Sequence, residues 1–288
     1  MALDQRIIDL YDTFTRGGMS RRELLNRLAQ AAGSAAAALA LLPLLEDNYA
    51  MAQTIPENDS RLAAGRIQYD AAGTQMTGYL ARLKPTQKRP AVLVISENRG
   101  LNPHIQDVAR RVAVEGFLAL APDPLSSSGG TPADENEAAK MIGSLNPKET
   151  LARFAATIAF LARHAESTGK VGVVGFCWGG GLVNQLAVAG TSLNAGVAYY
   201  GAQIPAADVP KISAPLLLHY GSLDERIDAG IADYEAALKA NHKTYEKYMY
   251  EGANHAFNND TNAERYNKAA ATLAWSRTIA FFKKNLAG

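Results

Sequence analysis

The stretch that most constrains the fold is the heptapeptide 175–181 (GFCWGGG), which directly follows an apolar run at 171–174 (VGVV). The valines predict a buried strand, and glycines on both sides of Cys177 allow a strand and a following helix to approach closely. We therefore expect a sharp turn with a strained backbone at Cys177, followed by a helix over about 178–189. Cys177 is also the only cysteine among the 288 residues.

Two interpretations of Cys177 compete. A lone cysteine is often a small buried hydrophobe with no chemical role. The flanking glycines instead form G-x-C-x-G, the pattern of a nucleophile elbow with sulfur in place of the usual serine oxygen. At a helix N-terminus, the dipole and the free N–H groups favour a thiolate and a developing oxyanion. We prefer the nucleophile, because an acid and a histidine follow downstream in the order that such sites use.

The candidate acid is Asp224. An apolar run at 215–220 predicts a buried strand, and 221–224 (GSLD) breaks it, so Asp224 lies just past a strand end. Glu225 and Asp228 are close by, and either could be the acid instead. Both fit solvated loop charges better, since Asp224 is the first carboxylate after the turn.

The candidate base is His255. It lies in a glycine-containing loop at 251–257 (EGANHAF), after a strand expected at 246–250 and before the last helix. There it would accept the thiol proton while Asp224 fixes its tautomer and supports the imidazolium. The other four histidines fit structural or surface roles better, because they fall inside a strand or near helix ends: His219, His164, His242 and His104.

A further loop follows the buried strand expected at 91–96 and reads 97–100 (ENRG). In this position a loop supplies the second N–H of an oxyanion hole, so Asn98 is the candidate donor alongside Trp178. Glu97 could be a plain surface charge. A carboxylate beside an oxyanion hole is electrostatically unhelpful, however, unless it has a role.

These motifs together resemble those of the dienelactone hydrolase family. The matching pieces span about 66–286 and are 97–100 (ENRG), 121–123 (APD), 169–180 (GKVGVVGFCWGG), Asp224 and 252–257 (GANHAF). The resemblance implies an α/β-hydrolase fold and a Cys177–His255–Asp224 triad acting on esters or lactones. It also implies that the resting thiol contacts Glu97 until substrate turns the sulfur towards the histidine.

One departure from the family pattern concerns substrate. The family's dienelactone-cleaving members carry two arginines that hold the substrate carboxylate, yet 122–130 and 255–259 contain none here. Since such arginine–carboxylate pairs are strong and specific, dienelactone itself is not the expected substrate. Arg99 or Arg226 could substitute from other loops. With Phe257, Arg99 is a candidate residue of the substrate pocket.

Composition limits the function classes. A chain with 48% hydrophobic residues and a net charge of +1 suits one sizeable α/β domain, at 53–288, plus an N-terminal segment at 1–52. Near-neutral charge argues against a nucleic-acid partner, and one cysteine excludes an intrachain disulfide. The sequence contains no metal-binding cluster and no dinucleotide fingerprint, so we expect no cofactor. A small ester or lactone is the expected partner, with the protein a monomer or homodimer.

Residues 1–52 allow two interpretations. Ser20 to Leu25 (SRRELL) is close to a twin-arginine export motif, and the uncharged run at 28–45 and 50–52 (AMA) complete a leader that would direct the protein to the periplasm. Apolar residues at helical spacing over 3–14 instead favour a retained helical appendage on a cytoplasmic protein. A stable membrane anchor is not expected, because the 28–45 run is marginal in length and broken by proline.

From residue 66 onwards, strand and helix patterns alternate, which predicts a mostly parallel eight-stranded sheet flanked by helices. The expected strands are 66–70, 76–83, 91–96, 117–121, 171–176, 195–200, 215–220 and 245–250, the first two as an antiparallel hairpin. The expected helices are 103–115, 147–164, 178–189, 229–241 and 263–284. The stretch 126–137 is expected to be the least ordered part and to serve as a cap or pocket loop.

The leading functional hypothesis is a cysteine-dependent carboxylic ester hydrolase. Thioester hydrolysis or acyl transfer would use the same residues. A non-catalytic binding protein would be expected to show a damaged triad, and none of the three residues is replaced here. A thiol-redox protein would need a resolving cysteine, which the chain lacks.

Overall fold

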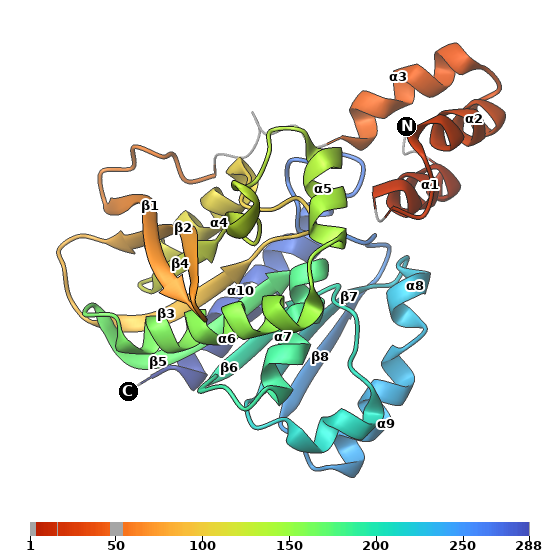
Figure 1. Cartoon of the computed structure of the whole chain (residues 1–288). Coiled ribbons are helices and arrows are strands. Elements are labelled where there is room, and N and C mark those ends of the chain that lie inside the picture. The colour runs from red at the N-terminus through yellow and green to blue at the C-terminus, as the bar shows by residue number, and fades with distance from the viewer. Residues whose placement is uncertain (1–3, 16, 47–53, 288) are drawn as a thin grey trace.

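The computed structural model describes residues 4–15, 17–46 and 54–287, and within these ranges it has an eight-stranded sheet in the order β1-β2-β4-β3-β5-β6-β7-β8 (Figure 1). β1 and β2 form an antiparallel hairpin, β2 pairs antiparallel with β4, and the other neighbours are parallel. The α/β-hydrolase architecture expected from the sequence is confirmed. The strands are Leu62–Ala71 (β1), Thr74–Leu83 (β2), Arg89–Ile95 (β3), Leu118–Pro122 (β4), Ser167–Phe176 (β5), Ala195–Tyr199 (β6), Leu216–Gly221 (β7) and Tyr245–Tyr250 (β8).

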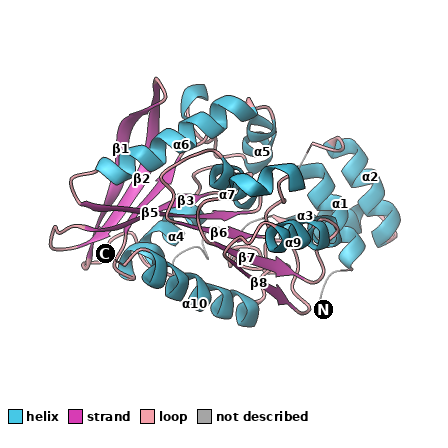
Figure 2. Ribbon diagram, turned by 90° about the horizontal axis from the view of Figure 1, so that it is seen from below, coloured by secondary structure: helices cyan, strands magenta, loops and turns pink. Residues whose placement is uncertain are grey.

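Helices cover both faces of the sheet, because its central strands are apolar on both sides. α4 and α10 pack on one face, and α6, α7 and α9 pack on the other (Figure 2). The helices of the body are Pro103–Val114 (α4), Glu135–Gly143 (α5), Pro147–Arg163 (α6), Trp178–Val188 (α7), Glu225–Asp228 (α8), Ile231–Ala240 (α9) and Lys268–Asn285 (α10).

Three N-terminal helices form a separate group beside α5 (Figure 1). They are Gln5–Thr15 (α1), Arg21–Ala32 (α2) and Ala35–Leu45 (α3). Their apolar residues, including Tyr11, Leu28 and Leu45, make a small hydrophobic core distinct from the two cores of the body. No single helix in the described part of the chain is long and apolar enough to cross a membrane. The pair α2 and α3 passes that test together, with a bend of 110° between them.

Two expected elements are wrong. The stretch 126–137, expected to be the least ordered, holds a 3₁₀ turn at Ser126–Ser128 and the start of α5, because the Asp134 carboxylate caps that helix by accepting two of its N–H groups. The helix expected at 229–241 is present as α9, and the short helix α8, which was not expected, precedes it. The last helix begins at Lys268 instead of 263, where the Asn267 side chain caps it.

Candidate active site

The strand-to-helix turn has the predicted strain. Cys177 joins β5 to α7 with a φ of 54°, in a region that residues with a side chain rarely adopt. The neighbouring glycines are required by close packing: a Cβ on Gly175 would lie 2.2 Å from the carbonyl oxygen of Gly179, and one on Gly180 would lie 2.6 Å from that of Tyr199. The turn therefore holds the half-buried Sγ at the N-terminus of α7.

The structure brings the three predicted side chains together. Sγ of Cys177 lies 3.0 Å from Nε2 of His255, and Nδ1 of the same ring is hydrogen-bonded to Oδ2 of Asp224. The three residues come from loops at the carboxyl ends of β5, β8 and β7, which meet at one edge of the sheet. Asp224 and His255 are buried. Glu225 is exposed, so the carboxylate at the imidazole is the first one after β7.

The charges around His255 favour its protonated form. Burial alone lowers the pKa of His255, but the negative charges of Cys177 and Asp224, with their hydrogen bonds to the ring, raise it to about 10. The imidazole therefore holds a proton at neutral pH when a thiolate lies beside it. Further along α8, the pKa of Asp228 is raised to about 6, chiefly by burial and secondly by repulsion from Asp224.

Glu97 lies in the same narrow cavity as Cys177 and His255 and is buried. Its carboxylate accepts hydrogen bonds from the Tyr200 hydroxyl (3.0 Å) and from Nδ2 of Asn259 (3.0 Å). The resemblance implied a resting thiol at this carboxylate. In the structure the sulfur contacts the imidazole of His255 instead, while Tyr200 and Asn259 hold the carboxylate in place.

The two candidate oxyanion donors flank the sulfur. Trp178 is the first residue of α7, so its N–H falls in the first turn, where a helix offers no acceptor of its own. Asn98 lines both the main pocket and the narrow cavity beside Cys177. Its side-chain Nδ2 donates to the carbonyl oxygen of Thr15, at the end of α1 (3.1 Å).

The main pocket beside Cys177 has a volume of about 400 Å³. Apolar side chains from α5, α7 and α8 form much of its wall, and they are Ala139, Ile142, Leu182 and Ile227, with Leu145 from the loop after α5. The pocket wall expected from 126–137 is thus supplied by α5, which begins at the end of that stretch. Exposed Arg226 also borders this pocket.

Two expected pocket residues lie elsewhere. Phe257 is fully buried, and its ring packs against Tyr200 and Tyr250. Arg99 lines the narrow cavity instead of the main pocket, and its guanidinium is paired with Glu135 at the start of α5.

The remaining histidines lie away from the sulfur. His219 is in the core, where Nδ1 contacts the Tyr250 hydroxyl (2.9 Å) and Nε2 contacts Thr278 (3.2 Å). Burial lowers its pKa to about 3, which keeps the ring neutral. The C-cap of α6 is His164, and His242 is exposed after α9.

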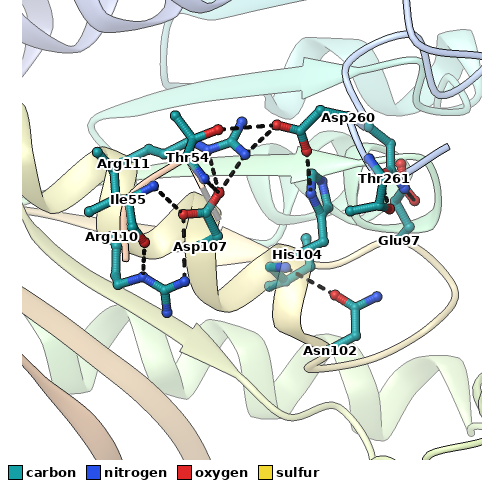
Figure 3. Close-up of polar contacts among 12 residues, drawn as sticks. Thr54, Ile55, Glu97, Asn102, His104, Asp107, Arg110, Arg111, Asp260 and Thr261 are labelled. Carbon is teal, nitrogen blue, oxygen red and sulfur yellow. Dashed lines mark hydrogen bonds and ion pairs between the residues drawn. The ribbon is translucent and has the colours of Figure 1, made fainter. Parts of the chain in front are cut away.

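A largely buried polar cluster on α4 contacts Asp260, in the segment that follows His255 (Figure 3). The carboxylate of Asp107 accepts the N–H groups of both residues at 54–55 (3.2 and 2.8 Å) and pairs with Arg111. Arg111 and the fourth histidine, His104, both pair with Asp260, five residues past His255. The cluster therefore anchors both the start of the body and the loop of the candidate base.

Several residues at the site have no clear signal in the sequence. Tyr200 follows the end of β6 and holds Glu97, while Asp12 and Thr15 come from α1. Arg265, which pairs with Asp12, lies in the turns before α10. A strand-end position could have suggested Tyr200, but nothing local predicts that α1 reaches the site. Among the described residues, no group of three or more acidic, histidine or cysteine side chains is placed to hold a metal ion.

Comparisons with known proteins agree with this geometry. The model of the dienelactone hydrolase family matches residues 76–286. A candidate carboxymethylenebutenolidase of Saccharolobus solfataricus is 32% identical over 254 residues, covering 76% of this chain and 97% of the relative. A relative with the same description from Escherichia coli K12 is 31% identical and covers 81% of this chain and 92% of its own.

Solved structures give the same picture. A crystal structure described as a candidate dienelactone hydrolase from Klebsiella pneumoniae superposes with a TM-score of 0.71 at 30% identity, covering 77% of this chain and 99% of the other. A dienelactone hydrolase-like promiscuous phosphotriesterase from metagenomic libraries has a TM-score of 0.68 at 25% identity, with 79% of this chain and all of the other covered. The family match, the shared length and the fold together establish that this chain belongs to the dienelactone hydrolase family.

Proposed function

We propose that this protein is a cysteine-dependent hydrolase of small carboxylic esters or lactones. One observation carries the proposal: Sγ of Cys177 lies 3.0 Å from Nε2 of His255, while Asp224 holds the other ring nitrogen. This is the contact that a nucleophile and its base need. Membership in a hydrolase family, and relatives described as carboxymethylenebutenolidases, support an ester or lactone substrate.

Acylation begins with attack of the Cys177 thiolate on the substrate carbonyl carbon, whose π electrons move onto oxygen. The N–H groups of Trp178 and Asn98 stabilise this oxyanion at the positive end of α7, and one such donor is typically worth ~3 kcal/mol. When the oxyanion collapses, the carbon–oxygen bond of the ester breaks. Protonated His255 gives its proton to the leaving oxygen, which yields a thioester on Cys177 and an alcohol.

Deacylation reverses these roles. Neutral His255 takes a proton from water as the water oxygen attacks the thioester. The carbon–sulfur bond then breaks, releasing the acid and restoring the thiolate beside a protonated imidazole. The raised pKa of His255, about 10, supports a protonated imidazole beside the sulfur in this state. A different acceptor in place of water would give acyl transfer through the same steps.

The pocket supports a small substrate. A volume of about 400 Å³ is at the lower end of the range for ligand pockets, and its walls are largely apolar. Glu97 and the sulfur line the same narrow cavity, and the negative charge of Glu97 would act on Cys177 across it. Its two hydrogen bonds favour a fixed carboxylate that keeps this side of the sulfur polar.

We further propose that residues 1–52 are retained in the active enzyme. The three helices have their own hydrophobic core, and α1 contacts the active-site loops through Thr15 and Asp12. Export with cleavage near residue 52 is the alternative. Intact-mass measurement of the protein from fractions of its native host distinguishes the two: a full-length chain supports retention, and a chain beginning near Gln53 refutes it.

The test of the hydrolase proposal is hydrolysis of p-nitrophenyl acetate by the purified protein. Iodoacetamide should abolish the activity, and Cys177→Ala and His255→Ala should each lower kcat/KM at least ~100-fold. As a matched control, His242→Asn changes an exposed histidine and should leave the rate unchanged. Full activity in Cys177→Ala would assign the chemistry to another residue and overturn the proposal.

A further inference from the structure

The C-terminal turn of α1 forms part of the active site. Thr15 borders both the main pocket and the narrow cavity, and its carbonyl oxygen accepts the hydrogen bond from Asn98. One helical turn earlier, Asp12 lines the same narrow cavity as Cys177 and His255. A helix far from the elbow in sequence thus places a carboxylate beside the candidate nucleophile.

This carboxylate forms an ion pair with Arg265. The two side chains are only 9% and 8% exposed, and Oδ1 of Asp12 lies 2.5 Å from a guanidinium nitrogen of Arg265. The buried ring of Tyr11 lies 5.8 Å from the same guanidinium. Because water does not screen a buried pair well, removing either partner leaves a charge that seeks a new counterion.

The second arginine in the narrow cavity is also paired within the chain. Arg99 binds Glu135, and both side chains are largely buried. A substrate carboxylate that approached Arg265 would therefore have to displace Asp12 and would also face Glu97 in the same cavity. Arg226 borders the main pocket, but it is exposed, and solvent weakens its attraction for an anion.

We propose that Asp12 determines substrate specificity through its ion pair with Arg265. Because Arg265 is already paired, the site accepts uncharged acyl groups and rejects acyl groups that carry a carboxylate. This inference rests on the proposed hydrolase function and adds a substrate class to it. The main pocket takes the apolar acyl chain, whereas the narrow cavity beside Cys177 has a volume of only about 20 Å³, and the Asp12 carboxylate both fills space there and repels a further anion.

The experiment compares p-nitrophenyl acetate with mono-p-nitrophenyl succinate in the full-length protein, using the ratio of the two kcat/KM values. Wild type should favour the acetate. Asp12→Ala should raise the succinate-to-acetate ratio at least ~10-fold, the scale of one new charge-assisted hydrogen bond. The double variant Asp12→Ala/Arg265→Gln should return the ratio to within about threefold of wild type, because the cation that attracts the carboxylate is then gone.

Two controls separate this effect from a general loosening of α1. Asp4→Asn alters an exposed acid at the start of α1, where its partner is Arg6, and should leave the ratio unchanged. Asp12→Asn, which keeps the side-chain volume, should raise the ratio in the same direction and serves if Asp12→Ala does not fold. An equal rise for both esters, or a raised ratio that persists without Arg265, would overturn the proposal. Failure of the hydrolase proposal has a separate sign, namely turnover of the acetate by Cys177→Ala.

Discussion

The close approach of β6 and α7 can be tested with two adjacent glycines of the elbow. A Cβ on Gly180 would lie 2.6 Å from the carbonyl oxygen of Tyr199 and 2.9 Å from Cα of Gly201, all of it backbone that cannot move aside cheaply. A Cβ on Gly181 has its nearest neighbour at 3.5 Å, an ordinary van der Waals distance. The same glycine-to-alanine change thus clashes with rigid backbone at one position and makes only ordinary van der Waals contacts at the next.

The expected energies follow from this difference. Both changes gain about 1 kcal/mol of helix propensity, since glycine is unfavourable within a helix. Gly180→Ala must also pay an overpacking penalty of about 1–3 kcal/mol. Gly181→Ala should therefore be as stable as wild type or slightly more so. The melting temperature of Gly180→Ala should be lower than that of Gly181→Ala by about 4–8 °C for a penalty of about 2 kcal/mol.

Thermal unfolding followed by circular dichroism measures this separation, with both variants at the same protein concentration and pH. Gly180→Ala should also slow alkylation of Cys177 by iodoacetamide at neutral pH, because a displaced α7 moves the sulfur away from His255. Equal melting temperatures for the two variants would refute the claim that the elbow depends on backbone contact between α7 and the end of β6.

Three further predictions concern the charges and polar contacts around the site. At pH 7, iodoacetamide should alkylate Cys177 far more slowly in His255→Asn than in wild type, because protonated His255, whose pKa is raised to about 10, favours negative charge on the neighbouring sulfur; matching rates would contradict this role. Tyr200→Phe removes a buried donor to Glu97 and should cost about 1–3 kcal/mol in urea denaturation, whereas an unchanged midpoint would show that the bond contributes nothing. Asp107→Ala removes the acidic partner of Arg110 and one of the two acidic partners of Arg111 and should cost about 3–5 kcal/mol, and a loss under 1 kcal/mol would contradict its role as the anchor of 54–55.

The sequence predicts the parts of the site that depend on local backbone geometry. Glycines 175, 179 and 180 mark the elbow, because only a residue without a side chain fits between strand and helix there. Asp224 and His255 follow from the same logic, since each comes directly after a strand whose carboxyl end reaches the same edge of the sheet. Because β7 and β8 are neighbours in the sheet, the strand order alone brings Asp224 and His255 together.

The parts that depend on packing between distant segments could not be predicted. Asp12 reaches Arg265 only because α1 to α3 fold onto one another and dock beside the active-site loops. Phe257 is a predicted pocket residue, yet its ring packs with Tyr250 in the core. The helix α5 was missed because polar and glycine residues precede it, and only the capping contact of Asp134 shows where it begins.

Covalent catalysis by sulfur can be observed directly through the acyl intermediate. Protein mixed with p-nitrophenyl acetate is quenched in acid within the first turnover, digested, and examined by peptide mass spectrometry. We expect one acetyl group on the peptide containing Cys177, removable by neutral hydroxylamine as a thioester, and no such adduct in Cys177→Ala. An acetyl group on a serine or lysine peptide, with the Cys177 peptide unmodified during active turnover, would contradict the assignment.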